Sequence, residues 1–178
     1  MSTVPEPVII GFEATVNPHF YLLHVRRHLT DELAEKYNRS TMTQAPDWIR
    51  PFFDFQPISD VHVMRHRIRF RTYKKGYSWQ LLVDYLVKKV LSGILGPFKL
   101  AEVDSSEPRR NYVMPVALTQ LTVVEGLKAS RAHPFTAAVY AIEGVTELKC
   151  QDWEMIVKRS PLYSWAEIEE QLVPLLGL

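Results

Sequence analysis

The feature of this sequence that most constrains its fold is a repeated tripeptide. Tyr-Ser-Trp occurs at 77–79 and again at 163–165. Apolar residues spaced three and four apart follow each copy, which is the pattern of an amphipathic helix. Each serine stands immediately before its helix, where its hydroxyl can accept a hydrogen bond from a first-turn N–H. A repeat of this kind indicates an internal duplication, and a duplication determines how the whole chain is divided.

The residues before each tripeptide follow the same order in both halves. Alternating apolar residues predict a two-stranded hairpin over 61–71 and another over 145–157, the second with its tip at 151–152. A short helix is expected before each hairpin, and an extended segment containing a proline before each helix. In the second half Pro134 suits the first helical position and Gly144 a helix end. In the first half the helix lies around 49–53, where Pro51 distorts it.

These patterns predict an α+β fold of two tandem small modules. Each module is expected to be a short, mostly antiparallel sheet with two helices on one face. The first module covers 1–96 and has an insertion near 29–45, in which 30–37 is expected to form a helical turn or two. The second covers 112–178, and the Pro-, Asp- and Ser-containing segment 97–111 is expected to be a linker. A single mixed α+β domain is the alternative.

Composition narrows the class of protein. The chain has 178 residues, of which 47% are hydrophobic and 23% charged, as in a globular protein. A net charge of +1 gives the molecule as a whole no electrostatic preference for nucleic acid or an anionic membrane. The single cysteine, Cys150, fits a reducing compartment. The apolar-rich stretch 79–95 is interrupted by charged residues, so it does not predict a membrane span. We therefore expect a cytoplasmic protein without membrane contact.

The second half also carries a resemblance to a known family. Residues 134–148 contain the turn Ile-Glu-Gly-Val, and Met-Ile-Val-Lys at 155–158 and Trp165 follow. This run resembles the N-terminal domain of the Nfu/NifU-type iron–sulfur scaffold proteins, in which a helix leads into a hairpin and a tryptophan opens the last helix. The segment 15–19 resembles the Thr-Pro-Asn-Pro-Asn opening of that family. The matching motif positions are Thr15, Asn17, Pro18, Gly144, Val145 and Lys158.

The resemblance implies a role in iron–sulfur cluster biogenesis. Full-length proteins of that kind add a domain whose Cys-x-x-Cys pair bridges a cluster, because thiolates are the ligands that such clusters need. This chain has one cysteine, and a second module of the N-terminal type stands where the cluster domain is expected. We therefore expect no metal or other cofactor. The implied role is that of a non-catalytic accessory protein whose partner is a protein, with the iron–sulfur assembly machinery as the implied partner.

No catalytic or metal-binding motif is recognised in the sequence. A Gly-x-Ser-x-Gly elbow and a glycine-rich phosphate loop are both missing. His24 and His28 are four residues apart, as are His62 and His66, but both pairs lie in segments typical of strands and lack a convincing third ligand. Cys150 is expected to be a buried core thiol. We therefore expect that the chain is not an enzyme.

The most distinctive candidate site is a basic strand. Arginines at every second position are expected on one face of it, with Ile68 and Phe70 toward the core. Aligned guanidinium groups repel one another unless acidic groups or an anionic partner offset their charge. Three interpretations are open: an edge strand that charge protects from unwanted pairing, a surface that docks an acidic protein region, and a nucleic-acid-binding surface. The candidate partner-binding residues are Arg65, Arg67, Arg69, Arg71, Lys74 and Lys75.

Overall fold

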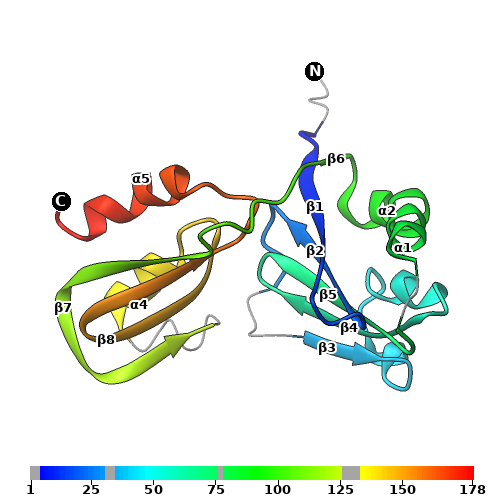
Figure 1. Ribbon diagram of the computed structural model, residues 1–178, viewed down its shortest axis with the longest axis horizontal. Coiled ribbons are helices and arrows are strands. Elements are labelled where there is room, and N and C mark those ends of the chain that lie inside the picture. Colours follow the sequence, from blue (N-terminus) through cyan, green and yellow to red (C-terminus); the bar gives the residue numbers. More distant parts are fainter. Residues whose placement is uncertain (1–4, 31–34, 76–77, 126–132) are drawn as a thin grey trace. The chain divides into compact units, whose positions relative to one another are not determined.

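The computed structural model describes residues 5–30, 35–75, 78–125 and 133–178. The chain has a mixed α/β architecture and divides into two compact units, the first ending at Val103 and the second beginning at Asp104. This division falls within the segment 97–111 that the sequence predicts as a linker. Each unit has a sheet and a hydrophobic core of its own (Figure 1).

The first unit contains a six-stranded sheet in the order β3-β4-β5-β2-β1-β6. All neighbouring strands are antiparallel except β1 and β6, which are parallel. β4 and β5 form the hairpin that the sequence predicts. The strands are β1 (Val8–Ala14), β2 (Phe20–Val25), β3 (Glu35–Asn38), β4 (Ile58–Met64), β5 (Arg67–Thr72) and β6 (Phe98–Leu100).

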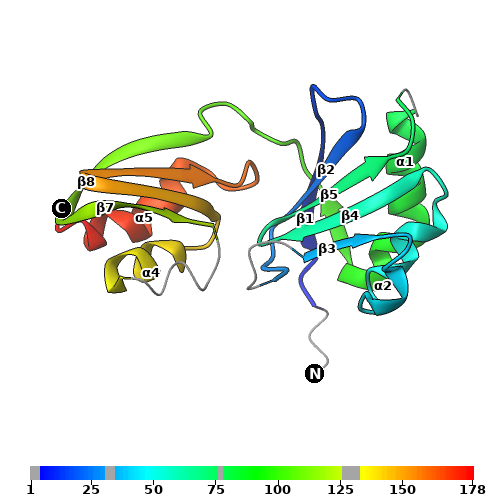
Figure 2. The ribbon, with the colours of Figure 1, turned by 90° about the horizontal axis from the view of Figure 1, so that it is seen from below.

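Helical segments cover one face of this sheet, as Figure 2 shows. Aromatic rings join the two layers: Phe52 packs on Phe70 with ring centroids 5.0 Å apart, and Trp79 stacks on Tyr21 at 5.1 Å. Ser78 caps the helix that starts at Trp79 by accepting from the Leu81 N–H at 3.4 Å. The segments are the 3₁₀ helices η1 (Met42–Gln44) and η2 (Arg50–Asp54), α1 (Trp79–Tyr85), the π-helical η3 (Leu86–Val90) and α2 (Leu91–Leu95).

The second unit consists of β7 (Arg109–Val124), α4 (Pro134–Tyr140), β8 (Val145–Arg159) and α5 (Trp165–Leu175). β7 and β8 pair antiparallel in one sheet. Ser164 begins α5 with a complete capping box: its hydroxyl accepts from the Glu167 N–H at 3.3 Å, and the Glu167 carboxylate accepts from the Ser164 N–H at 2.8 Å. The buried residues that join helices and sheet include Val139, Leu148, Met155, Val157, Ile168 and Leu172.

β8 folds back on itself. The Ser160 N–H donates to the Gly144 carbonyl at 2.7 Å, and the Thr146 hydroxyl donates to the Lys158 carbonyl at 3.2 Å. A straight strand of this length would hold its ends roughly 45–50 Å apart, so β8 must turn near its middle. Asp152 has a φ of +52°, as a tight turn requires. The predicted hairpin with its tip at 151–152 is therefore confirmed.

β7 follows both arms of this hairpin. Residues 109–113 pair with 154–158, and residues 122–124 pair with 148–150. The intervening residues 114–121 pass around the hairpin tip, with two irregularities in register. Figure 1 shows the same course, with β7 turning back outside β8.

The first unit contains the same arrangement of strand segments. In its sheet β2, β5, β4 and β3 are neighbours in this order. Along the chain it has two strands, β2 and β3, then η2, the hairpin β4–β5 and α1. The second unit likewise has the two arms of β7, then α4, the two arms of β8 and α5. β1 and β6 are additions that only the first unit contains among the described residues.

Several sequence predictions need correction. The extended, proline-containing segment predicted before the first helix, residues 15–25, contains a turn and β2, because β1 and β2 form a hairpin. Residues 35–38 form β3 rather than the helix expected over 30–37, since they pair with β4. The rest of that prediction, 31–34, lies outside the described residues. The expected linker contains β6, which pairs with β1. The helix near Pro51 is a short 3₁₀ turn, as that proline favours.

Candidate functional site: the arginine face

The basic strand β5 lies inside the sheet, between β4 and β2, and is not an edge. The interpretation of its arginines as protection of an exposed edge is therefore wrong. The predicted alternation is confirmed, because Ile68 and Phe70 are buried while the arginines that alternate with them lie on the other face. That face is opposite the layer of helices in the first unit. We call it the arginine face and define it by Arg67, Arg69, Arg71 and their neighbours in β2 and β4.

The strand register aligns these neighbours in three rows across the sheet. Residues directly opposite one another point to the same side of a sheet, so the members of each row share one face. Sequence patterns alone do not reveal these rows, because their members come from strands far apart in the chain. The rows are Asp60–Arg71–Phe20, His62–Arg69–Leu22 and Met64–Arg67–His24.

Arg69, in the central row, is held by its neighbours. Its Nη2 donates to Nδ1 of His62 at 2.7 Å, and its guanidinium lies over the ring of Phe20 with 4.8 Å to the centroid. Burial lowers the pKa of His62 below its usual value, and the charge of Arg69 lowers it further. His62 is therefore neutral near pH 7 and can accept this hydrogen bond. The Nε of Arg69 is buried and has no hydrogen-bond partner.

The cationic groups of this face outnumber the acidic ones. Lys36 of β3 extends the central row, opposite His62, and Glu13 of β1 ends it, opposite Leu22. His24 contacts Glu13 with 2.6 Å between Nε2 and Oε2. Burial lowers the pKa of His24, an effect larger than the opposing effect of Glu13, so His24 adds no positive charge at neutral pH. Three arginines and one lysine thus face two carboxylates, those of Asp60 and Glu13.

Arg71 is the most accessible arginine of the three. Its side chain is exposed, whereas those of Arg67 and Arg69 are half-buried. Among the described residues, no hydrogen bond or ion pair engages its guanidinium. Its cross-strand neighbour Asp60 instead accepts a hydrogen bond from the hydroxyl of Ser59 at 2.5 Å. Arg71 is therefore the group best placed to meet an anion from solution.

The other predicted basic residues lie outside these rows. Arg65 lies in the turn between β4 and β5, where its carbonyl accepts from the Leu29 N–H at 2.8 Å. Four aligned strand arginines were expected, but the strand contains three. Lys74 and Lys75 follow the end of β5 and are exposed. They continue the basic run beyond the sheet.

The family-motif residues of the first half form a turn between β1 and β2. The Thr15 hydroxyl donates to the Asn17 carbonyl at 2.8 Å, and the Asn17 side chain accepts from the His19 N–H at 3.0 Å. The Pro18 carbonyl accepts from the Tyr21 hydroxyl at 3.3 Å. These contacts explain the three motif positions by local structure alone.

The motif residues of the second half also have structural contacts. Gly144 has a φ of +88°, and a β-carbon there would lie 2.5 Å from Cγ of Tyr163. Val145 is fully buried at the start of β8. Lys158 lies 3.7 Å from a carboxylate oxygen of Glu147.

The predicted core position of Cys150 is confirmed, because the residue is fully buried and desolvation raises the pKa of its thiol to about 11.

The histidine pairs do not converge on a metal site. His66 directs Nδ1 to the Arg27 carbonyl at 3.2 Å, while His62 contacts Arg69. The described part of the chain contains no group of three or more His, Cys, Asp or Glu side chains that could hold a metal ion.

None of the described helices is long and apolar enough to cross a membrane. Comparison of the chain with protein-family models, with curated proteins and with solved structures finds no match.

Proposed function

We propose that this chain is a non-catalytic binding protein whose arginine face docks an acidic region of a protein partner. The observation that carries the proposal is the position of β5: three arginines occupy successive positions on one face of a central strand. A central strand is already paired on both sides, so it needs no charge to prevent further pairing. An acidic partner would offset the mutual repulsion of the guanidinium groups.

The remaining side chains of the face favour a protein partner over nucleic acid. Single-stranded nucleic acid binds to sheets largely by stacking its bases on free aromatic rings. The aromatic ring in the three rows, Phe20, is covered by the guanidinium of Arg69. Leu22 and Met64 lie beside the arginines, and arginine and methionine are enriched where proteins meet.

Nucleic acid is the second candidate. It is favoured by Lys74 and Lys75, which are exposed and extend the basic run past the end of β5. A phosphate backbone would contact such a run without any need for base stacking. Its binding would then weaken steeply with salt and would depend little on sequence.

The proposed duplication supports the assignment of partner binding to the first unit. We infer that the two units derive from one module, because both contain the same order of strand segments, helix, hairpin and helix. The first unit adds β1 and β6 and carries the arginine face.

The proposed link to iron–sulfur cluster assembly rests on the family resemblance of 134–158. In this proposal the partner is a protein of the assembly machinery, and Cys150 does not bind a cluster. A thiol whose pKa is raised by burial is poorly suited to bind metal as a thiolate.

The test uses the double variant Arg67→Gln/Arg71→Gln in the full chain. Binding of fluorescent poly-L-glutamate and of a mixed-sequence RNA is measured by anisotropy near 0.1 M salt. We expect poly-L-glutamate to bind, and the variant to bind it about tenfold more weakly. The control Lys88→Gln/Lys89→Gln removes the same charge from exposed residues of η3 and should bind as the wild type does.

Three outcomes would count against this proposal. Tighter, salt-sensitive binding of RNA that the double variant loses would replace the protein partner with nucleic acid. Failure of the wild type to bind either polymer would overturn the role of the arginine face. Equal losses in the control and the double variant would show that overall charge, rather than this face, causes binding. Affinity purification from native cells, with iron measured in the eluate, tests the proposed assembly partner separately.

A further inference from the structure

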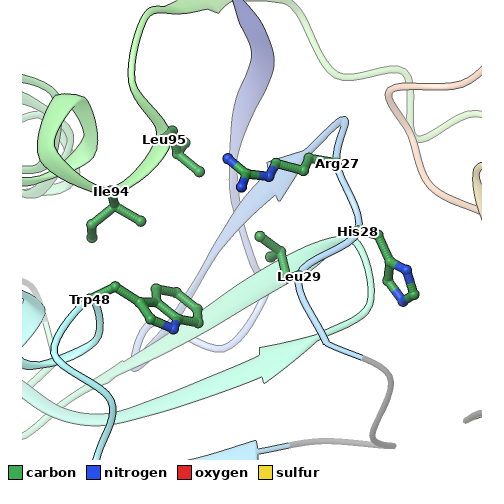
Figure 3. A pocket seen from close by; sticks show the side chains of 6 residues that line it. All are labelled: Arg27, His28, Leu29, Trp48, Ile94 and Leu95. Atoms are coloured by element: carbon green, nitrogen blue, oxygen red, sulfur yellow. The ribbon is translucent and has the colours of Figure 1, made fainter.

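A second candidate site lies in the first unit, away from the rows of the arginine face. It is a cavity of about 240 Å³. Three separate parts of the chain form its walls: the segment after β2, the turn before η2 and the end of α2 (Figure 3). The described residues that line it are Arg27, His28, Leu29, Trp48, Ile94 and Leu95.

Most of the described side chains that line this cavity are apolar. Leu29, Ile94 and Leu95 contribute aliphatic side chains, and the indole of Trp48 lies across from Arg27 in Figure 3. An apolar cavity of about 150 Å³ is enough to bind a benzene molecule. A volume of about 240 Å³ therefore accommodates a small aromatic or branched aliphatic body.

The cationic group of the cavity is Arg27. Its side chain is exposed and its guanidinium reaches over the cavity toward Leu95 (Figure 3). No hydrogen bond or ion pair with another described residue engages this guanidinium. The described lining also contains no carboxylate that would neutralise it. An arginine fork of this kind matches the two oxygens of a carboxylate.

Hydrogen bonds and burial hold the backbone of two walls of the cavity in place. The Arg27 carbonyl accepts from the buried ring of His66 at 3.2 Å, and the Leu29 N–H donates to the Arg65 carbonyl at 2.8 Å. On the opposite wall, the Ile49 N–H donates to the Pro46 carbonyl at 2.9 Å, and Ile49 is fully buried next to Trp48. A preformed site reduces the entropy lost when a ligand binds.

We propose that this cavity is a binding site for a small apolar carboxylate, in which Arg27 pairs with the carboxylate and Trp48, Ile94 and Leu95 hold the apolar body. This site is independent of the arginine face, because its lining includes none of the residues in the three rows. It adds a small-molecule ligand to a protein that the arginine face links to a macromolecule.

Titration calorimetry with 2-naphthoate tests the proposal on the full chain. We expect a dissociation constant on the order of 0.1–1 mM, given the small size of the ligand. The neutral analogue 2-naphthamide and the variant Arg27→Gln should each weaken binding about tenfold, because each removes one partner of the charged pair. The control Lys89→Gln loses an equal charge from an exposed residue outside the cavity and should leave the affinity unchanged.

Amide chemical shifts recorded during the same titration locate the ligand. Shifts are expected to concentrate on residues 27–29, 48 and 94–95 and to be lost in Arg27→Gln. The proposal is overturned if wild-type protein does not bind 2-naphthoate, if 2-naphthamide or the Arg27 variant binds equally well, or if the shifts map elsewhere.

Discussion

The sheets of the two units share an order of strand segments but differ on their open faces. β5 carries Arg67, Arg69 and Arg71 there, and it pairs with β2. The corresponding arm of β8, residues 154–158, pairs with 109–113 and carries Glu, Ile and Lys at the equivalent positions. A sheet with this order of strand segments therefore forms without the arginines, as the proposed binding role requires.

The open face of the second unit includes exposed apolar side chains beside charged ones. Val113 is 75% exposed and Leu121 is 54% exposed, and Leu121 lines a shallow hollow with Ile156 and Lys149. Exposed apolar side chains and exposed arginines attract different surfaces. The open faces of the two sheets therefore differ in chemistry within one chain.

The largest expected effect lies at Gly144, where the hairpin of the second unit begins. Gly144→Ala should destabilise the protein by about 3 kcal/mol, because alanine is strained at positive φ and its β-carbon collides with Tyr163. Urea unfolding followed by circular dichroism measures the change. Gly93→Ala is the control: nothing lies within 4 Å of the added carbon, so this helical substitution should stabilise by about 0.5–1 kcal/mol. A loss at Gly144 no larger than about 1 kcal/mol would contradict the account.

The next largest change in stability is expected at the two tryptophans of the repeated tripeptide. Trp165 donates its indole N–H to the Glu107 carbonyl at 2.8 Å, and the guanidinium of Arg110 lies 5.0 Å from its ring. Trp79 instead stacks on Tyr21. Trp165→Phe should destabilise by about 2 kcal/mol, because it leaves a carbonyl without its donor. Trp79→Phe keeps a ring for stacking and should cost about 1 kcal/mol or less. The reverse order in thermal unfolding would contradict this difference.

The smallest effect separates the two serine caps. Ser164 takes part in a capping box, whereas Ser78 accepts one hydrogen bond, at 3.4 Å. Ser164→Ala should therefore cost about 1 kcal/mol and Ser78→Ala about 0.5 kcal/mol. Native-state hydrogen exchange in the first turns of α5 and α1 reports each cap locally. Equal changes at the two helix starts would mean that the capping box contributes nothing here.

Local features of the fold were predictable from the sequence. The Pro134 helix, the β4–β5 hairpin, the hairpin tip at 151–152 and both serine caps depend on residues close together in the chain. The alternation of Arg67, Arg69 and Arg71 with buried residues was predictable for the same reason. Period-two patterns report which face of a strand is buried, wherever that strand lies in the sheet.

Features that depend on distant pairing were not predictable. Residues 35–38 lie next to good helix formers in the sequence, yet their pairing with β4 makes them a strand. β6 lies in a segment that looked like a linker, and only its parallel pairing with β1 makes it a strand. The central place of β5 follows from its pairing with β2, more than forty residues upstream. The Arg27 cavity was missed because its walls come from three separate segments.

The most direct test of the central claim replaces the three arginines of the first sheet with the residues at the equivalent positions of the second. The variant Arg67→Glu/Arg69→Ile/Arg71→Lys copies the equivalent positions in 154–158. Urea unfolding and poly-L-glutamate affinity are measured on the same preparation. We expect the unfolding free energy to stay within about 1–2 kcal/mol of the wild type, the loss being that of the Arg69 contacts. We expect the affinity to fall about a hundredfold. Affinity close to that of the wild type, or a sheet that no longer folds, would contradict it.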